Sequence, residues 1–104
     1  MERLAIQNEV CGLSNTLIAE IGAIACRHGL QRVILFGSRA RGDYRRISDI
    51  DLAVSGGNVP AFTLDVDEET HTLLRFDVVD LDGAVQADLR DAIRREGKVI
   101  YEKV

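Results

Sequence analysis

The segment GSRARGDYRRISDIDLAV, residues 37–54, decides the fold that this sequence predicts. An apolar run over residues 32–36 precedes it and is typical of a strand that is buried on both faces. The glycines at the ends of 37–42 indicate a turn that leads into a short helix. Polar and apolar residues then alternate over 49–54, as they do in an amphipathic strand. The segment therefore predicts a strand, a glycine turn with a short helix, and a second strand.

The flanking sequence predicts the remaining elements of one layered domain. Before the segment, apolar residues recur at helical spacing from Leu17 to His28, with Ser14 placed to cap the helix and Gly29 to end it. The other expected elements are a turn or short helix at 4–10, an ambiguous segment at 62–74 for which a helix is favoured over a strand, a strand at 76–81, a helix at 85–93 closed by Gly97, and an edge strand at 99–101. We expect a single domain over residues 1–104, of the α/β (α+β) class, with a small mixed β-sheet and flanking helices.

The composition is that of an ordinary globular protein with a small negative charge. Of 104 residues, 13 are Lys or Arg and 17 are Asp or Glu, so the formal net charge is −4, which disfavours nucleic acid as a partner. No apolar run can span a bilayer and no signal-peptide block is present, so we expect a cytoplasmic protein without membrane contact. Cys11 and Cys26 are expected to be packed free thiols. The small size favours a homodimer or a complex with a partner protein.

Gly37 and Ser38 form the first candidate binding feature. A glycine at the end of a buried strand, followed by a serine at a helix start, leaves backbone N–H groups without partners inside the helix. Such groups, beside the positive end of a helix, can bind phosphate oxygens, and the Ser38 hydroxyl can donate one more hydrogen bond. Gly-Ser pairs are also common in ordinary turns, so this feature alone leaves both interpretations open.

Asp49 and Asp51 form the second feature. Residues two apart in a strand project from the same face, so both carboxylates can converge on one point while Ile50 and Leu52 point into the core. Like charges this close repel each other unless a cation lies between them, and Mg²⁺ is commonly bound by one or two carboxylates, waters and substrate phosphates. The alternative is that the pair belongs to the solvent-facing side of an amphipathic strand.

A cluster of arginines is the third feature. Arg39, Arg41, Arg45 and Arg46 fall between the glycine turn and the aspartates, although the chain as a whole is acidic. One guanidinium group can bind two phosphate oxygens at once, so the cluster can neutralise the charge of a triphosphate. A solvated loop whose arginines pair with local acids such as Asp43 is the alternative.

The three features together resemble the signature of a known family. Gly-Ser-x-Ala-Arg-Gly at 37–42, followed by Ser-Asp-Ile-Asp-Leu at 48–52, is similar to the signature of the minimal nucleotidyltransferases, small members of the DNA polymerase beta superfamily. The resemblance covers most of the chain and implies the nucleotidyltransferase core of that superfamily. The site residues that it implies are Asp49, Asp51 and Asp77 for metal binding and catalysis, and Gly37 and Ser38 for binding the triphosphate. From the arginine cluster we add Arg39 and Arg41 to the expected triphosphate site.

The third carboxylate is chosen by the resemblance rather than by periodicity. The expected strand at 76–81 contains Asp77 and Asp80, which have opposite parity and so face opposite sides of a sheet. Alternation alone does not decide which of them faces the site. The family pattern favours Asp77.

The resemblance also implies an activity and a partner. Members that resemble this sequence act as antitoxins beside a higher-eukaryote-prokaryote nucleotide-binding (HEPN) ribonuclease toxin and transfer AMP to a tyrosine of that toxin. The implied reaction is protein adenylylation with ATP and two Mg²⁺ ions. A metal and triphosphate core takes up nearly all of the 104 residues, which favours an acceptor on another macromolecule. The alternatives are a non-catalytic antitoxin that neutralises its partner by contact, and a small-molecule nucleotidyltransferase.

Overall fold

The computed structural model describes residues 9–104. In chain order, the elements of this range are β1 (Glu9–Val10), β2 (Leu13–Ser14), α1 (Asn15–Arg27), β3 (Arg32–Phe36), α2 (Ser38–Arg41), β4 (Ile50–Ser55), α3 (Val59–Glu69), β5 (Phe76–Asp80), α4 (Ala87–Glu96) and β6 (Lys98–Glu102). The turn or helix expected at residues 4–10 falls mostly outside the described residues. Its last two residues form β1, which pairs antiparallel with β2.

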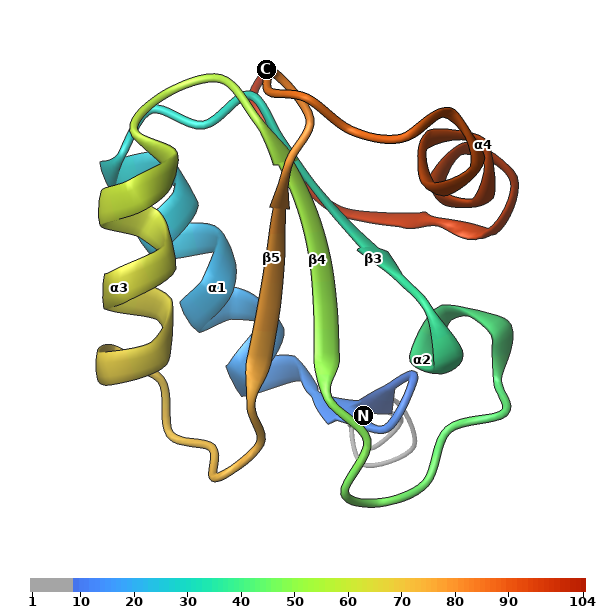
Figure 1. The fold of residues 1–104 in the computed structure, drawn as a ribbon. Helices are drawn as coiled ribbons and strands as arrows, with labels where there is room; N and C mark the ends of the chain where they lie inside the picture. Colours follow the sequence, from blue (N-terminus) through green and yellow to red (C-terminus); the bar gives the residue numbers. More distant parts are fainter. Residues whose placement is uncertain (1–8) are drawn as a thin grey trace.

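The main sheet has four strands in the order β5-β4-β3-β6 and is mixed, as predicted. β3 pairs antiparallel with β4 and with β6, whereas β4 and β5 run parallel. The parallel pair needs a crossover connection, and α3 supplies it. The strand expected at the end of the chain is confirmed as β6, at one edge of the sheet (Figure 1).

Helices cover both faces of this sheet (Figure 1). α1 and α3 pack side by side on one face, over a core that includes Leu35, Leu52 and Phe62. α4 packs on the other face, where Ile34 and Ile93 belong to a smaller cluster. Alternate residues of β3 therefore enter different cores, which confirms that this strand is buried on both faces.

The first helix begins and ends where the sequence predicts. The Ser14 hydroxyl accepts a hydrogen bond from the Leu17 N–H at 3.1 Å, which satisfies one of the free donors of the first turn. At the other end Gly29 has a φ of +74°, a left-handed conformation that glycine adopts without strain. These two residues confine α1 to Asn15–Arg27.

The ambiguous segment is a helix, as favoured, but it begins earlier and ends earlier than expected. The Asn58 side chain caps α3 by accepting from the Ala61 N–H at 3.2 Å, and Pro60 lies in the first turn, where its missing N–H has no helical partner to lose. Phe62 and Val66, one helical turn apart, are fully buried. Burial of such side chains, worth about 1.5–3 kcal/mol each, favours the helical spacing over the strand spacing.

One expectation about the cysteines is wrong. Cys26 lies on α1 outside the buried stripe of that helix and is exposed, whereas Cys11 is half-buried against the larger core. Both are free thiols. The apolar stripe is formed instead by Leu17, Ile21 and their neighbours, so the thiol of Cys26 is not needed for packing.

The helices within the described part of the chain are short. The longest, α1, has 13 residues. Within residues 9–104, no helix has both the length and the apolar character required to cross a membrane.

Candidate active site

The predicted site residues gather at one end of the sheet. β3 ends at Phe36 and leads through Gly37 into α2, and β4 begins beside this end because the two strands are antiparallel. β5 begins at the same end because it runs parallel to β4. The glycine turn and the starts of two strands therefore lie together, on the side of α2 in Figure 1.

The strand register places Asp51 and Asp77 directly beside each other. They are paired residues of the parallel strands β4 and β5, so their side chains leave the same face of the sheet. This is the α4 face, because Ala53, two residues after Asp51, belongs to the core cluster beneath α4. Asp49 is exposed and lies immediately before β4. Three carboxylates from two neighbouring strands therefore lie at one corner of the sheet.

The same register separates the two candidates for the third carboxylate. Asp80 pairs with Val54, three residues further along β4, and its carboxylate accepts a hydrogen bond from the Asp82 N–H at 2.9 Å. Asp77 and Asp80 are both exposed, but it is Asp77 that is paired with Asp51. The position of Asp77 is the one that the family pattern predicts.

Gly37 makes room for the carboxylate of Asp51. A side chain at position 37 would overlap the Asp51 Oδ2 atom, and its Cβ would lie only 3.0 Å from Asp51 Cγ. Gly37 also has a φ of +76°, which disfavours any residue with a side chain. The turn therefore requires glycine for two reasons, the backbone conformation and the close approach of an aspartate.

The ionisation of Asp51 depends on its burial and on the neighbouring carboxylates. Partial burial raises the pKa of Asp51, and the negative charges of Asp77 and Asp49 raise it further. Arg41 and Arg39 act in the opposite direction without cancelling the effect. The corner is therefore a place where ionised carboxylates repel one another, and a bound cation would reverse that repulsion.

The donor set fits a hard divalent cation, although it is not a preassembled cage. Within residues 9–104, no three carboxylate, imidazole or thiol groups lie close enough to hold a metal ion by themselves. Mg²⁺ does not require such a group, since it is usually held by one or two carboxylates together with water and substrate phosphate oxygens. Aspartates from adjacent strands, one of them with a raised pKa, match that pattern.

The one-turn helix α2 supplies the groups opposite the carboxylates. It begins after Gly37, and no side chain caps its start. Ser38 is its first residue and is half-buried, and Gly42 ends it with a φ of +94°. The turn from Gly37 to Ser38 therefore faces the aspartate corner without a protein side chain to occupy its N–H groups.

Arg41 lies at the edge of the site. Its guanidinium is exposed and contacts the Asp43 carboxylate at 3.3 Å and the Glu96 carboxylate at 3.4 Å, which together raise its pKa. Its charge also lowers the pKa of Asp51, so it is close enough to act on the carboxylate corner. Such exposed ion pairs are weak and can be exchanged for a phosphate.

Arg39 corrects the sequence-based assignment. Its side chain is only 1% exposed, and its guanidinium donates to the carbonyl oxygens of Cys11 at 3.1 Å, Arg46 at 3.2 Å and Ser48 at 2.9 Å. It also stacks 4.9 Å above the Tyr44 ring. With these donors engaged by protein, the Arg39 side chain fastens the loop after α2 to the β1–β2 hairpin and is not placed to bind a triphosphate.

The remaining two arginines of the cluster follow the solvated-loop alternative. Arg45 and Arg46 are both exposed. The Arg45 N–H donates to the Ser48 hydroxyl at 2.8 Å, and the Arg46 carbonyl accepts from Arg39. Their backbone shapes the loop between α2 and β4, while their side chains extend away from the core.

Comparisons with known proteins show the family to which the fold belongs. A family model described as polymerase beta, nucleotidyltransferase, matches residues 20–104. A proposed minimal nucleotidyltransferase of known structure is 31% identical, with a TM-score of 0.62 over 78% of this chain and 86% of that one. A toxin–antitoxin complex crystallised with AMP-PNP is 26% identical, with a TM-score of 0.63 over 83% of this chain and 73% of that one.

A proposed nucleotidyltransferase from Sulfolobus solfataricus is also similar. It is 26% identical, with a TM-score of 0.53, over 84% of this chain and 78% of that one. Among curated proteins, none matches the chain significantly.

Proposed function

This chain belongs to the minimal nucleotidyltransferases of the polymerase beta superfamily, and we propose that it transfers AMP from ATP to a tyrosine hydroxyl of a partner protein. The observation that carries the proposal is the register that sets Asp51 beside Asp77, with Gly37 open to the Asp51 carboxylate. Nucleotidyl transfer depends on holding a triphosphate and its charge in such a place.

Asp49, Asp51 and Asp77 are the proposed ligands of two Mg²⁺ ions, which when bound would neutralise phosphate charge and lower the pKa of the acceptor hydroxyl. The raised pKa of Asp51 supports this role, because burial and the negative charges of Asp77 and Asp49 all disfavour its ionised form, and a bound cation would offset that effect. Asp51 lies between its two neighbours and is the proposed shared ligand.

The glycine turn is the proposed binding site for the triphosphate. Gly37 and Ser38 would offer backbone N–H groups and the Ser38 hydroxyl to phosphate oxygens, with the Arg41 guanidinium as a mobile positive charge at the edge. The Arg39 side chain has no part in this proposal, because it is buried among carbonyl groups.

The proposed reaction is a displacement at the α-phosphorus. The acceptor oxygen forms a bond to this phosphorus while the bond to the oxygen bridging the α- and β-phosphates breaks, and pyrophosphate leaves with the electron pair. The phenolic proton passes to the Asp77 carboxylate, which is exposed beside Asp51. The chain's contribution is to position the two reactants and to hold the proton acceptor.

The proposed partner is a HEPN-domain toxin. Support comes from the structural similarity to a toxin–antitoxin complex that was crystallised with AMP-PNP. In this proposal the acceptor tyrosine belongs to the toxin, and its modification is what neutralises the toxin. Neutralisation by contact alone, without transfer, is the competing function.

Mass spectrometry of the partner separates transfer from simple contact. The partner is incubated with the protein, ATP and Mg²⁺, and a gain of one or more AMP units on a tyrosine is the expected result. Complex formation with no added mass would contradict the proposed transfer. Asp80→Asn is the matched control variant, because Asp80 lies on the same strand as Asp77 but away from the site, and its gain should equal that of the wild type.

A further inference from the structure

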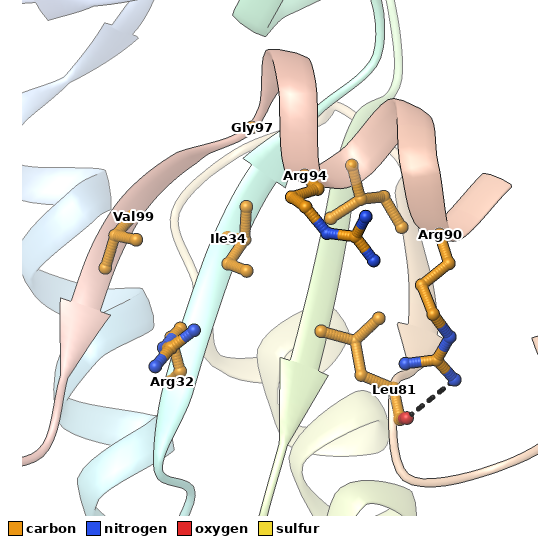
Figure 2. A pocket seen from close by; sticks show the side chains of 8 residues that line it. Arg32, Ile34, Leu81, Arg90, Arg94, Gly97 and Val99 are labelled. Carbon is orange, nitrogen blue, oxygen red and sulfur yellow. Dashed lines mark hydrogen bonds between the residues drawn. The ribbon is translucent and has the colours of Figure 1, made fainter.

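A second feature lies on the α4 face of the sheet, beyond the carboxylate corner. It is a half-open pocket of about 310 Å³ between α4 and the strands β3 and β6. The residues that line it are Arg32, Ile34, Leu81, Arg90, Ile93, Arg94, Gly97 and Val99. Figure 2 shows Arg90 and Arg94 extending from α4 and Arg32 standing on β3, around the apolar side chains. None of the proposed catalytic residues lines the pocket.

The arginines of the pocket form only weak contacts with the rest of the protein. Arg94 is 70% exposed and contacts Asp91 at 3.2 Å, and Arg32 is 49% exposed and contacts Glu102 at 3.4 Å. Both acids are themselves exposed, so these pairs add little stability and can be exchanged for another carboxylate. Arg90 is anchored by a hydrogen bond from one nitrogen to the Leu81 carbonyl at 3.1 Å.

The pocket combines this charge with an apolar surface. Ile93 is buried and Ile34 nearly so, and Val99 is half exposed at the rim. A simple anion would contact the arginines but would leave the apolar surface exposed to water. A segment with an acidic side chain next to an apolar one would contact both the arginines and the apolar surface. The chain as a whole has a net charge of −4, so the pocket is a local exception that favours acidic partners.

The pocket also has a fixed relation to the proposed site of transfer. Arg32, Ile34 and Phe36 project from the same face of β3, and Phe36 is the residue paired with Asp51. At about 3.3 Å per residue, Ile34 lies about 7 Å along the strand from the level of the carboxylates. A protein bound in the pocket would therefore reach the carboxylate corner with a neighbouring side chain.

We propose that this arginine pocket docks the acceptor protein, by receiving a segment that carries an acidic side chain next to an apolar one. The inference rests on the proposed function, since it assumes that the acceptor is a protein. It adds a recognition element that is separate from the groups that hold nucleotide. Docking at the pocket lowers the concentration of acceptor needed for transfer and leaves the chemical step unchanged.

Nuclear magnetic resonance tests the docking without an identified partner. The probe is the peptide acetyl-Glu-Leu-Glu-amide, titrated into the labelled protein while the Nε–Hε signals of the arginines and the backbone signal of Val99 are followed. We expect saturable shifts of Arg90, Arg94 and Val99. Arg94→Ala should weaken binding about fivefold to tenfold, as expected for loss of one partly exposed charged contact. The peptide acetyl-Lys-Leu-Lys-amide should cause no such shifts.

Arg95→Ala is the matched control, because Arg95 lies on the same helix, is 67% exposed and does not line the pocket. Its affinity for the acidic peptide should equal that of the wild type. Absence of saturable shifts, or equal loss in Arg94→Ala and Arg95→Ala, would overturn the proposal. Tighter binding of a single-stranded oligonucleotide, with the same dependence on Arg94, would also overturn it.

ATP and Mg²⁺ provide the arm that separates this inference from the proposed function. ATP binding should be unchanged in Arg94→Ala, and weaker ATP binding in this variant than in the wild type would assign the pocket to the nucleotide instead. In the transfer assay with partner protein, Arg94→Glu should raise the KM for the partner at least fivefold with kcat unchanged. A lower kcat with an unchanged KM would contradict docking. If the wild type and all variants transferred no AMP, that result would contradict the proposed function alone.

Discussion

The two ends of the α4 face of the sheet carry opposite charges, which differ in how the surrounding protein compensates them. At one end Asp49, Asp51 and Asp77 lie together, and the partial burial of Asp51 and the negative charges of the other two carboxylates raise its pKa. At the other end Arg90 and Arg94 face apolar residues, and the exposed Arg94 has a carboxylate of its own helix beside it. Uncompensated like charge is unfavourable for folding, so it points to a ligand more strongly than charge that is already paired.

The largest expected effect comes from removing the central charge of the acidic end. Asp51→Asn should lower AMP transfer by at least about a hundredfold, the size found when one stabilising group is removed from a reaction site. It should leave the free energy of unfolding unchanged or higher, because it removes a repelled charge. Transfer assays and chemical denaturation of the same preparation check both statements. Near-normal transfer, or a marked loss of stability, would contradict the assigned role.

Arg39 tests the opposite case, a charge that serves the fold. Arg39→Met should lower the free energy of unfolding by about 3 kcal/mol, because the part-buried carbonyls of Cys11, Arg46 and Ser48 would lose the charged donors of a buried guanidinium. Arg41→Ala, two residues away and exposed, should change it by less than about 0.5 kcal/mol. Arg41→Ala should instead raise the KM for ATP. Equal loss of stability in both variants would refute the distinction.

These two arginines show where sequence-based prediction stops. The glycine motif at 37–42 and the alternation at 49–54 predict the turn and the strands, because each depends on local backbone chemistry. The structural role of Arg39 depends on a hydrogen bond to the carbonyl of Cys11, 28 residues away, and on burial of its side chain by the folded loop. Neighbouring arginines in one motif can thus have unrelated roles.

The same limit applies to the other assignments that needed three-dimensional contacts. Strand parity left Asp77 and Asp80 open, and only the parallel register of β4 and β5 sets Asp77 beside Asp51. In the ambiguous segment, the burial of both Phe62 and Val66 in the core favours a helix over a strand. The arginine pocket had no sequence signal, because its charged residues come from β3 and α4, which are far apart in the chain.

Gly37 allows a test of the close approach that shapes the acidic end. Gly37→Ala should lower the free energy of unfolding by about 2 kcal/mol or more, through left-handed strain and overlap of the new Cβ with Asp51. Gly42→Ala is the matched control, since its φ is also positive, at +94°, but a Cβ there meets nothing within 4 Å. Its cost should be about 1 kcal/mol, that of strain alone. Equal losses in thermal denaturation would exclude a contribution from contact with Asp51.

The smallest effect expected is on the pH dependence of stability. Because the folded pKa of Asp51 is raised above its unfolded value, the folded state binds the proton more tightly. This contribution is fully present below the unfolded pKa and is lost as pH rises through the folded pKa. From acidic to neutral pH, the free energy of unfolding of the wild type should fall relative to that of Asp51→Asn, as measured by chemical denaturation at each pH. Parallel curves would contradict a raised pKa of Asp51 in the folded state.

Crystals grown with Mn²⁺ and AMP-PNP test the central claim most directly, because the anomalous scattering of manganese locates each cation without reference to activity. The account predicts anomalous density between the carboxylates of Asp49 and Asp51, with Asp77 beside it and the triphosphate on the Gly37–Ser38 turn. Nucleotide bound with manganese elsewhere, or with these three carboxylates free of any cation, would contradict it.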